Sequence, residues 1–351
     1  MRFTAGWFAL AHLVALSAPL AARGQAPASV EVAAGDRIHG DVQRLERGRL
    51  AFRTASRSAP GAQRWGGTIA IVWTEVVRLE SEQLLEIELS SGERHTGAVS
   101  SPSPGRLVVR TPSGATSPIE LRDIVSIIPL EAGFRARTTG TLDVGFSLAS
   151  AQGTRTYSVN GQARHRSPGY AADTRLTLHS WLSAREGTET LTRNDVGVDV
   201  RRRLDGRWYA VAAGRFQQDE PLELDTRVLV GGGVGRRIVR SQRMEASLHG
   251  GLAYDAENYA EADTSHSAEA VAALDLDWFA PGSATGATLD TTTFISLARA
   301  RARLEVDGSL RRDFLWNLYW ALNVFERFDS DPPGDRPRSD LGVSFTLGWA
   351  F

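Results

Sequence analysis

Few residues in this sequence are placed to do chemistry, and those that are lie in segments of alternating polar and apolar residues. Ser247 and His249 are two positions apart, so they would share one face of a strand. A histidine base beside a serine nucleophile could hydrolyse a lipid ester. His179 and Ser180 are adjacent and would point to opposite faces. Because polar lining of a barrel explains the first pair without catalysis, we predict that the protein is not an enzyme.

Patterns for metal or cofactor binding are also missing from the sequence. It contains no cysteine, and its histidines form no His-Glu-x-x-His or His-x-His motif, so we predict no metal site and no cofactor. The glycine-rich run at 231–235 could be mistaken for a nucleotide-binding loop, but no helix pattern follows it. Inside a strand, such glycines indicate a bend or close packing of backbones.

The composition narrows the class of protein further. The chain has 351 residues, 42% of them hydrophobic, and a formal net charge of −1. This charge gives no general attraction to nucleic acid, so we predict no nucleic-acid partner. No segment after the first residues has 18 continuous apolar residues, which argues against a membrane-spanning helix there.

Residues 1–25 have the pattern of a signal peptide. Arg2 is followed by an apolar stretch from Trp7 to Leu20 and then by small residues at 21–26. A membrane anchor is the alternative, but the stretch is shorter than the roughly 20 residues that a spanning helix needs and contains a proline. We therefore predict export, with cleavage between residues 22 and 26.

From about residue 139 the sequence divides into alternating segments separated by short turn signals. Twelve strands are predicted, at 139–149, 154–166, 171–184, 191–203, 207–218, 224–239, 243–255, 264–278, 288–297, 301–312, 317–328 and 339–351. Twelve is an even number, as in bacterial single-chain barrels, and ten strands are the nearest alternative. Alternation alone also fits a soluble β-sandwich with its apolar residues inside.

Two features favour a transmembrane β-barrel in the outer membrane over a sandwich. Residues Phe345, Leu347, Trp349 and Phe351 alternate up to a final aromatic, like the assembly signal that the barrel-insertion machinery binds. Tryptophans also gather near the connections that follow even-numbered strands, as an aromatic belt at the periplasmic interface would. The predicted belt is Trp208, Trp278, Trp316, Trp320 and Trp349.

The polar face of these strands would line the lumen with charges of both signs. The predicted luminal residues are Asp195, Asp199, Arg201, Arg227, Glu245, Glu269, Asp275, Asp277, Arg303, Glu305, Asp307, Arg311 and Arg327. Pairing across strands would plug the lumen, whereas unpaired charges would line a small pore. Both interpretations stay open at this point.

Residues 28–130 contain an internal repeat that predicts a small duplicated β domain. The matching blocks are 35–40 with 92–97, 49–54 with 106–111, and 71–79 with 119–127. The predicted copies, 28–81 and 84–130, each alternate around a glycine-bearing turn and resemble SH3-like or Sm-like barrels. We predict that this domain lies in the periplasm and contacts another envelope protein or peptidoglycan.

The barrel segment also resembles a known family. Residues 224–235, the stretch 317–333 and the terminal strand at 341–351 are similar to the YdiY-like, salt-induced outer-membrane proteins. The resemblance covers roughly residues 136–351 and implies an outer-membrane β-barrel of uncharacterised activity with no catalytic residues to transfer. The duplicated domain is not part of that pattern.

Together these features predict an all-β outer-membrane protein with a structural or interaction role, or a small passive pore. Its expected partners are outer-membrane lipid, the insertion machinery and an envelope component. A secreted, soluble all-β ligand-binding protein is the main alternative. A lipid-modifying barrel enzyme, with His249 as its base, is a more distant one.

Overall fold

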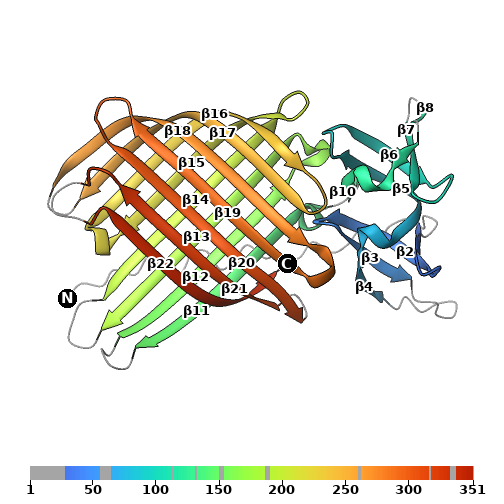
Figure 1. Ribbon diagram of the computed structural model, residues 1–351, viewed down its shortest axis with the longest axis horizontal. Coiled ribbons are helices and arrows are strands. Elements are labelled where there is room, and N and C mark those ends of the chain that lie inside the picture. The colour runs from blue at the N-terminus through green and yellow to red at the C-terminus, as the bar shows by residue number, and fades with distance from the viewer. Residues whose placement is uncertain are drawn as a thin grey trace.

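The computed structural model describes most of the chain as two all-β units joined end to end (Figure 1). The described residues are 28–55, 65–111, 114–116, 118–130, 133–149, 154–185, 190–259, 262–315, 318–332 and 337–350. The predicted signal peptide, Trp316 and Phe351 lie outside these ranges. No helix in the described ranges is both long enough and apolar enough to cross a membrane. The predicted fold class is confirmed.

The C-terminal unit is a closed antiparallel barrel of twelve strands. Its strands are β11 (Thr138–Ala149), β12 (Thr154–Arg166), β13 (Ala172–Arg185), β14 (Leu191–Arg203), β15 (Trp208–Asp219), β16 (Leu224–Arg240), β17 (Met244–Tyr259), β18 (Ala262–Ala280), β19 (Thr285–Ser296), β20 (Ala302–Leu315), β21 (Leu318–Asp329) and β22 (Ser339–Ala350). Each strand pairs with the next, and β22 closes the ring on β11 between Thr141↔Ala350 and Val144↔Leu347. The predicted number of strands is confirmed.

Strands β17 and β18 are longer than predicted. The predicted strands leave residues 256–263 as a loop, but Glu257 pairs with Ser265 and Tyr259 with Ala262. The side chain of Glu257 is buried inside the barrel against arginines, so a polar residue here extends the hairpin.

The outer face of the barrel wall is apolar and its inner face is polar, as expected for a barrel surrounded by lipid. Large apolar side chains point outward along the strands, and Leu341, Val343 and Phe345 of β22 are each at least 60% exposed. A soluble sandwich would bury these residues between its sheets. The sheet also closes on itself through the four residue pairs between β11 and β22, and closure of this kind is what a β-sheet needs in hydrocarbon. The apolar exterior and the closure identify a transmembrane β-barrel and exclude the sandwich for this unit.

The glycine-rich run lies within β16 and not in a loop. A Cβ atom on Gly233 would lie 2.8 Å from the Cα atom of Gly251 on β17. The backbones of these strands therefore approach too closely for a larger residue, as expected from glycines inside a strand.

The N-terminal unit is a ten-stranded sheet folded around one hydrophobic core in the described residues. Its strands are β1 (Ala28–Val32), β2 (Arg37–Glu46), β3 (Arg49–Ala55), β4 (Trp65–Val72), β5 (Val76–Leu89), β6 (Arg94–Ser100), β7 (Arg106–Thr111), β8 (Gly114–Ala115), β9 (Ile119–Glu120) and β10 (Ile124–Pro129). The long strand β5 runs through the predicted boundary between the two copies, so both copies share it. The core includes Phe52, Trp73 and Ile87, all buried.

Backbone contacts in this domain recur with the spacing of the sequence repeat. The equivalent contacts are the strand partners Val30↔Leu79 and Ile87↔Ile127, and the hydrogen bonds from the amides of Ala33 and Ser90 to the carbonyls of Glu75 and Asp123. The first copy uses the beginning of β5 as its closing strand, and the second uses the end of β5 as its opening strand. This recurrence supports an internal duplication, while the SH3-like or Sm-like resemblance stays a prediction.

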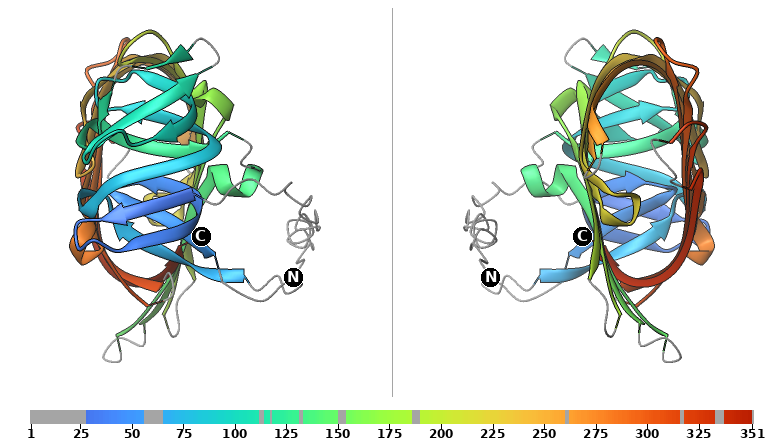
Figure 2. Two further views of the ribbon diagram at one scale, coloured as in Figure 1. Left: turned by 90° about the vertical axis from the view of Figure 1, so that its right-hand side faces the viewer. Right: turned by 90° about the vertical axis from the view of Figure 1, so that its left-hand side faces the viewer.

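The N-terminal domain lies across one end of the barrel (Figure 2). This is the end where β11 begins and where the connections after β12, β14, β16, β18 and β20 lie (Figure 1). The far end of the barrel carries the connections after the odd-numbered strands of the twelve.

Candidate functional site: the barrel lumen and its covered end

Charged side chains fill the lumen and are paired across it. All thirteen predicted luminal residues lie on the inward face of their strands, opposite to the exposed apolar positions. Most of them form ion pairs, for example Arg327 with Asp307 at 2.7 Å and Arg201 with Asp275 at 2.9 Å. Of the two interpretations left open by the sequence, the structure shows pairing.

Several of these ion pairs connect strands that are far apart around the ring. Arg215 on β15 pairs with Glu305 on β20, and Arg193 on β14 pairs with Asp340 on β22 at 2.7 Å. Arg175 on β13 lies 3.9 Å from Asp290 on β19, six strands away in a ring of twelve. Strands six apart face each other across a barrel of twelve. These bridges therefore show that side chains from opposite walls contact each other across the lumen. The cross-section is correspondingly flattened in the end-on view (Figure 2).

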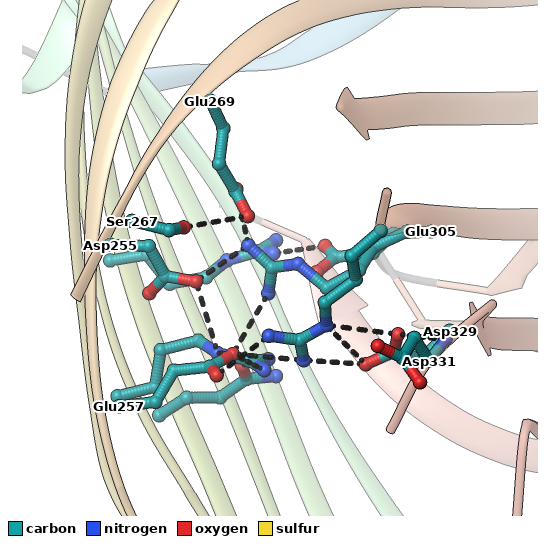
Figure 3. Close-up of polar contacts among 12 residues, drawn as sticks. Asp255, Glu257, Ser267, Glu269, Glu305, Asp329 and Asp331 are labelled. Atoms are coloured by element: carbon teal, nitrogen blue, oxygen red, sulfur yellow. Dashed lines mark hydrogen bonds and ion pairs between the residues drawn. The ribbon is translucent and has the colours of Figure 1, made fainter. Parts of the chain in front are cut away.

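The densest part of the network (Figure 3) lies near the connections that follow β17 and β19, at the end away from the N-terminal domain. Arg303 on β20 donates to Asp255 on β17 at 2.6 Å and to Glu269 on β18 at 2.5 Å. Next to it, Arg301 binds Glu257 at 2.9 Å and Asp329 at 2.5 Å. Arg303, Asp255 and Glu269 are at most 4% exposed. Buried charges are stable only when paired and hydrogen-bonded, so these residues form one interdependent unit.

Ser247 and His249, the two residues that could form a hydrolase site, lie nearer to the covered end of the lumen. The hydroxyl of Ser247 donates to Asp275 at 2.8 Å, and Arg201 also contacts this hydroxyl at 3.4 Å. The Nδ1 atom of His249 lies 3.8 Å from the same carboxylate. The serine is thus held by the ion pair of Asp275 and not by the histidine. The Nδ1 atom of His179 lies 3.1 Å from the Oδ1 atom of Asn160, so this histidine contacts an amide and not a serine.

At the covered end, carboxylates of the N-terminal domain meet arginines of the barrel. Glu46 binds Arg166 at 2.6 Å, and Glu88 binds Arg240 at 2.9 Å. Glu86 accepts from the backbone amide of Gly169, in the connection between β12 and β13, at 2.9 Å. These three acidic residues belong to the domain, and the partners named above belong to the barrel or its rim. Glu88 also binds Arg94 within the domain at 2.8 Å.

Backbone carbonyls extend this interface to neighbouring connections. Arg203 and Arg207, which flank the turn between β14 and β15, donate to the carbonyls of Gly92 and Ser90 at 2.5 and 3.1 Å. The amide of Gln242, between β16 and β17, donates to the carbonyl of Ile124 at 2.9 Å. In the reverse direction, Arg49 of the domain donates to the carbonyl of Pro281, after β18, at 2.8 Å. The domain is therefore held at four successive connections of the barrel rim.

The interface lowers the pKa of two carboxyl groups that it buries, those of Glu46 and Glu88. Burial would raise the pKa of Glu46, but the positive charges of Arg166, Arg44 and Arg47 outweigh it and lower the pKa to about 2. For Glu88, burial likewise acts to raise the pKa, and the arginines at 240 and 94 lower it overall. Both groups are therefore ionised in neutral solution.

A small cavity remains between the two units. It encloses about 380 Å³, including space open to solvent, and is lined by Glu46 and Arg47 of the domain and by Arg164, Arg240 and Glu245 of the barrel. Its lining therefore includes side chains of both charges. Among the described residues, no group of histidine and acidic side chains is placed to hold a metal ion.

The predicted belt residues that the structure describes lie at the covered end. Trp208 begins β15, Trp320 lies near the start of β21, and Trp278 and Trp349 lie near the ends of β18 and β22. All four point outward, and Trp208 and Trp349 are each 48% exposed. Of the predicted assembly signal, Phe345, Leu347 and Trp349 form the outward face of β22.

Sequence reasoning missed the contacts between the domain and the barrel. A usable signal was present, because arginines cluster at the strand ends next to the even-numbered connections, as in 201–203 and 236–240. Their partners could not be recognised, because half of them are backbone carbonyls, which carry no sequence signature.

Comparison with known proteins agrees with the architecture of the C-terminal unit. A family model described as "Protein of unknown function, DUF481" matches residues 138–351. No curated protein matches the chain. The predicted family resemblance is confirmed over this range, and the N-terminal domain lies outside it.

Several solved structures match the chain at low identity. A NanC porin is 12% identical, with a TM-score of 0.39, over 60% of this chain and 98% of that chain. A bacterial polysaccharide outer membrane secretin is 12% identical, with a TM-score of 0.32, over 61% and 97%. The translocator domain of the autotransporter NalP from Neisseria meningitidis is 10% identical, with a TM-score of 0.33, over 60% and 86%. These values are too low to transfer any property from those proteins.

The family match covers more than half of the chain and coincides with all twelve strands of the barrel. The chain belongs to the family described as protein of unknown function, DUF481, and its C-terminal unit is a transmembrane β-barrel of the outer-membrane type.

Proposed function

We propose that this protein anchors its N-terminal domain to the inner face of the outer membrane through a barrel that is closed at rest. The domain would lie in the periplasm and present its free surface to another envelope protein or to peptidoglycan. The proposal assigns a structural or interaction role and no catalysis. The observation that carries it is the set of arginine–carboxylate bridges between opposite walls of the lumen.

Two properties of these bridges support a closed state. They occur at several heights along the barrel, from Arg193 and Asp340 near one end to Arg201 and Asp275 nearer the domain. Several arginines are also held by two carboxylates, as Arg303 is by Asp255 and Glu269. A solute would have to break more than one buried pair to pass, and each such break is costly.

The placement of the domain in the periplasm is supported by the outward tryptophans at the same end. Aromatic residues concentrate at membrane interfaces, and short connections are typical of the periplasmic side of such barrels. The connections at this end span two to five residues, whereas the connection between β21 and β22 at the far end spans nine, 330–338.

Conductance in planar bilayers tests the closed state. We expect the full-length protein to give no stepwise current. The double variant Arg201→Gln/Arg215→Gln, which removes two bridges, is expected to give steps, and heat-dependent mobility on SDS gels would show that it is still folded. Regular steps from the unmodified protein would contradict the closed barrel.

A small passive pore is the second candidate, and one observation favours it. Asp290 and Asp307 face the lumen, yet their side chains are 42% and 43% exposed. Some space accessible to water therefore remains beside them. Steps from the unmodified protein that change when these two residues are replaced by asparagine would support the pore.

A further inference from the structure

Pairs of tryptophan and arginine face outward on two sides of the barrel, at the end that the N-terminal domain covers. Trp208 on β15 and Arg236 on β16 are direct cross-strand partners, and the guanidinium carbon lies 5.7 Å from the ring centroid. Trp320 on β21 and Arg312 on β20 are also direct cross-strand partners. The two pairs are separated by about half of the ring of strands.

The orientation of these side chains follows from their neighbours. Tyr209 and Tyr319, next to the two tryptophans in the chain, are buried inside the barrel. Since successive side chains of a strand alternate, Trp208 and Trp320 must face outward. Arg236 and Arg312 are exposed, as is Arg202 on β14, whose cross-strand partner Ala210 lies two residues from Trp208.

The outward surface at this end has a single sign of charge. Along the described strands, its outward positions carry arginine and no carboxylate, because the nearby acids Asp173 and Asp313 face the lumen. An arginine that faces lipid is strongly destabilising at the bilayer midplane but much less so at the membrane interface. These arginines therefore fit the depth of the phosphate groups, where tryptophan is also most favourable.

We propose that the Trp208–Arg236 and Trp320–Arg312 pairs bind the phosphates of phospholipids in the leaflet next to the N-terminal domain, with a preference for anionic headgroups. A guanidinium group binds phosphate through two parallel hydrogen bonds. In the first pair the indole of Trp208 also restricts Arg236 by a cation–π contact. In both pairs the indole would pack against the upper acyl chain. The two sites would fix the depth of the barrel on both sides, which goes beyond the anchoring role proposed above.

Lipid retention in native mass spectrometry tests this inference. The full-length protein is reconstituted in nanodiscs of phosphatidylcholine and phosphatidylglycerol in equal amounts and released with mild detergent. We expect it to retain phosphatidylglycerol in preference to phosphatidylcholine, and the Arg236→Gln/Arg312→Gln variant to lose at least half of that preference. Arg155→Gln is the matched control, because Arg155 lies near the other end of β12 and has no tryptophan among its cross-strand partners.

Heat-dependent mobility on SDS gels verifies that each variant is folded before its lipids are counted. Equal preference for phosphatidylglycerol in the unmodified protein and the double variant would overturn the proposal. The same holds if Arg155→Gln has as large an effect. In nanodiscs of phosphatidylcholine alone, stabilisation by inorganic phosphate that depends on Arg236 and Arg312 would assign the sites to a free anion and would also overturn it.

Discussion

Glu46 of the N-terminal domain and Arg166 of the barrel form an ion pair of 2.6 Å that joins the two separate sheets of the protein. The side chain of Arg166 is 8% exposed and that of Glu46 is 19% exposed. Such a partly buried pair resists screening by salt better than a surface pair does. It lies beside the cavity between the two units, so its loss would loosen the domain directly over the mouth of the barrel.

Charge reversal tests whether this pair holds the domain in place. Glu46→Arg would bring a fifth cation next to Arg166, Arg44, Arg47 and Arg164, so we expect the domain to become sensitive to limited proteolysis. The swapped variant Glu46→Arg/Arg166→Glu should recover most of the resistance, because it restores an opposite pair. If the swap were as sensitive as the single variant, the pair would not determine docking.

The low pKa of Glu46 makes docking sensitive to acid. Its pKa is about 2 in the folded protein, against 4.5 without perturbation, so the carboxylate contributes stability that is fully present above about pH 4.5. This stability decreases as the pH falls towards 2. The thermal midpoint of the domain should therefore fall more steeply between pH 4.5 and 2 in the unmodified protein than in Glu46→Gln. Parallel curves for the two proteins would show that Glu46 contributes nothing to docking.

The strand pattern of the barrel could be predicted from sequence because membrane burial imposes a regular alternation on every strand. The inward position of Asp275 and Arg303, for example, follows from the apolar residues on either side of each. Their ion-pair partners could not be predicted. Asp275 on β18 binds a residue of β14, and Arg303 on β20 binds a residue of β17, and which distant strands come close depends on the shape of the cross-section. The predicted C-terminal end of β17 was wrong for a related reason, because Glu257 is polar yet is buried against arginines.

Removal of a central arginine should destabilise the luminal network strongly. Arg303→Gln leaves Asp255 and Glu269 buried without their shared cation, so we expect a loss of about 3–5 kcal/mol in the free energy of unfolding. Urea unfolding in lipid vesicles would measure it. The control is Arg311→Gln, because the partner of Arg311, Asp313, is 37% exposed, and such pairs contribute about 0–1 kcal/mol. Equal losses in the two variants would mean that burial of the network adds no stability.

A luminal tyrosine explains one of the glycines in the run on β16. Tyr209 and Gly235 are cross-strand partners, and a Cβ atom on Gly235 would lie 2.6 Å from both the hydroxyl oxygen of Tyr209 and the Cβ atom of His249. We expect Gly235→Ala to cost about 1–3 kcal/mol in stability, as overpacking does. The added mutation Tyr209→Leu should recover part of this loss. Gly250→Ala, whose added atom would meet only the carbonyl of Val271 at 3.5 Å, should be nearly neutral.

Two glycines at equivalent positions of the duplicated domain provide a test of the duplication. A Cβ atom on Gly40 would lie 2.8 Å from the carbonyl carbon of Arg53, and one on Gly97 would lie 2.7 Å from that of Arg110. Since both obstacles are backbone atoms, neither site can relax without moving a strand. We expect Gly40→Ala and Gly97→Ala to lower the thermal midpoint of the domain by similar amounts, and Gly67→Ala, which has open space around it, to leave the midpoint unchanged. A large loss at only one of the two sites would mean that the copies no longer share the packing that their common spacing implies.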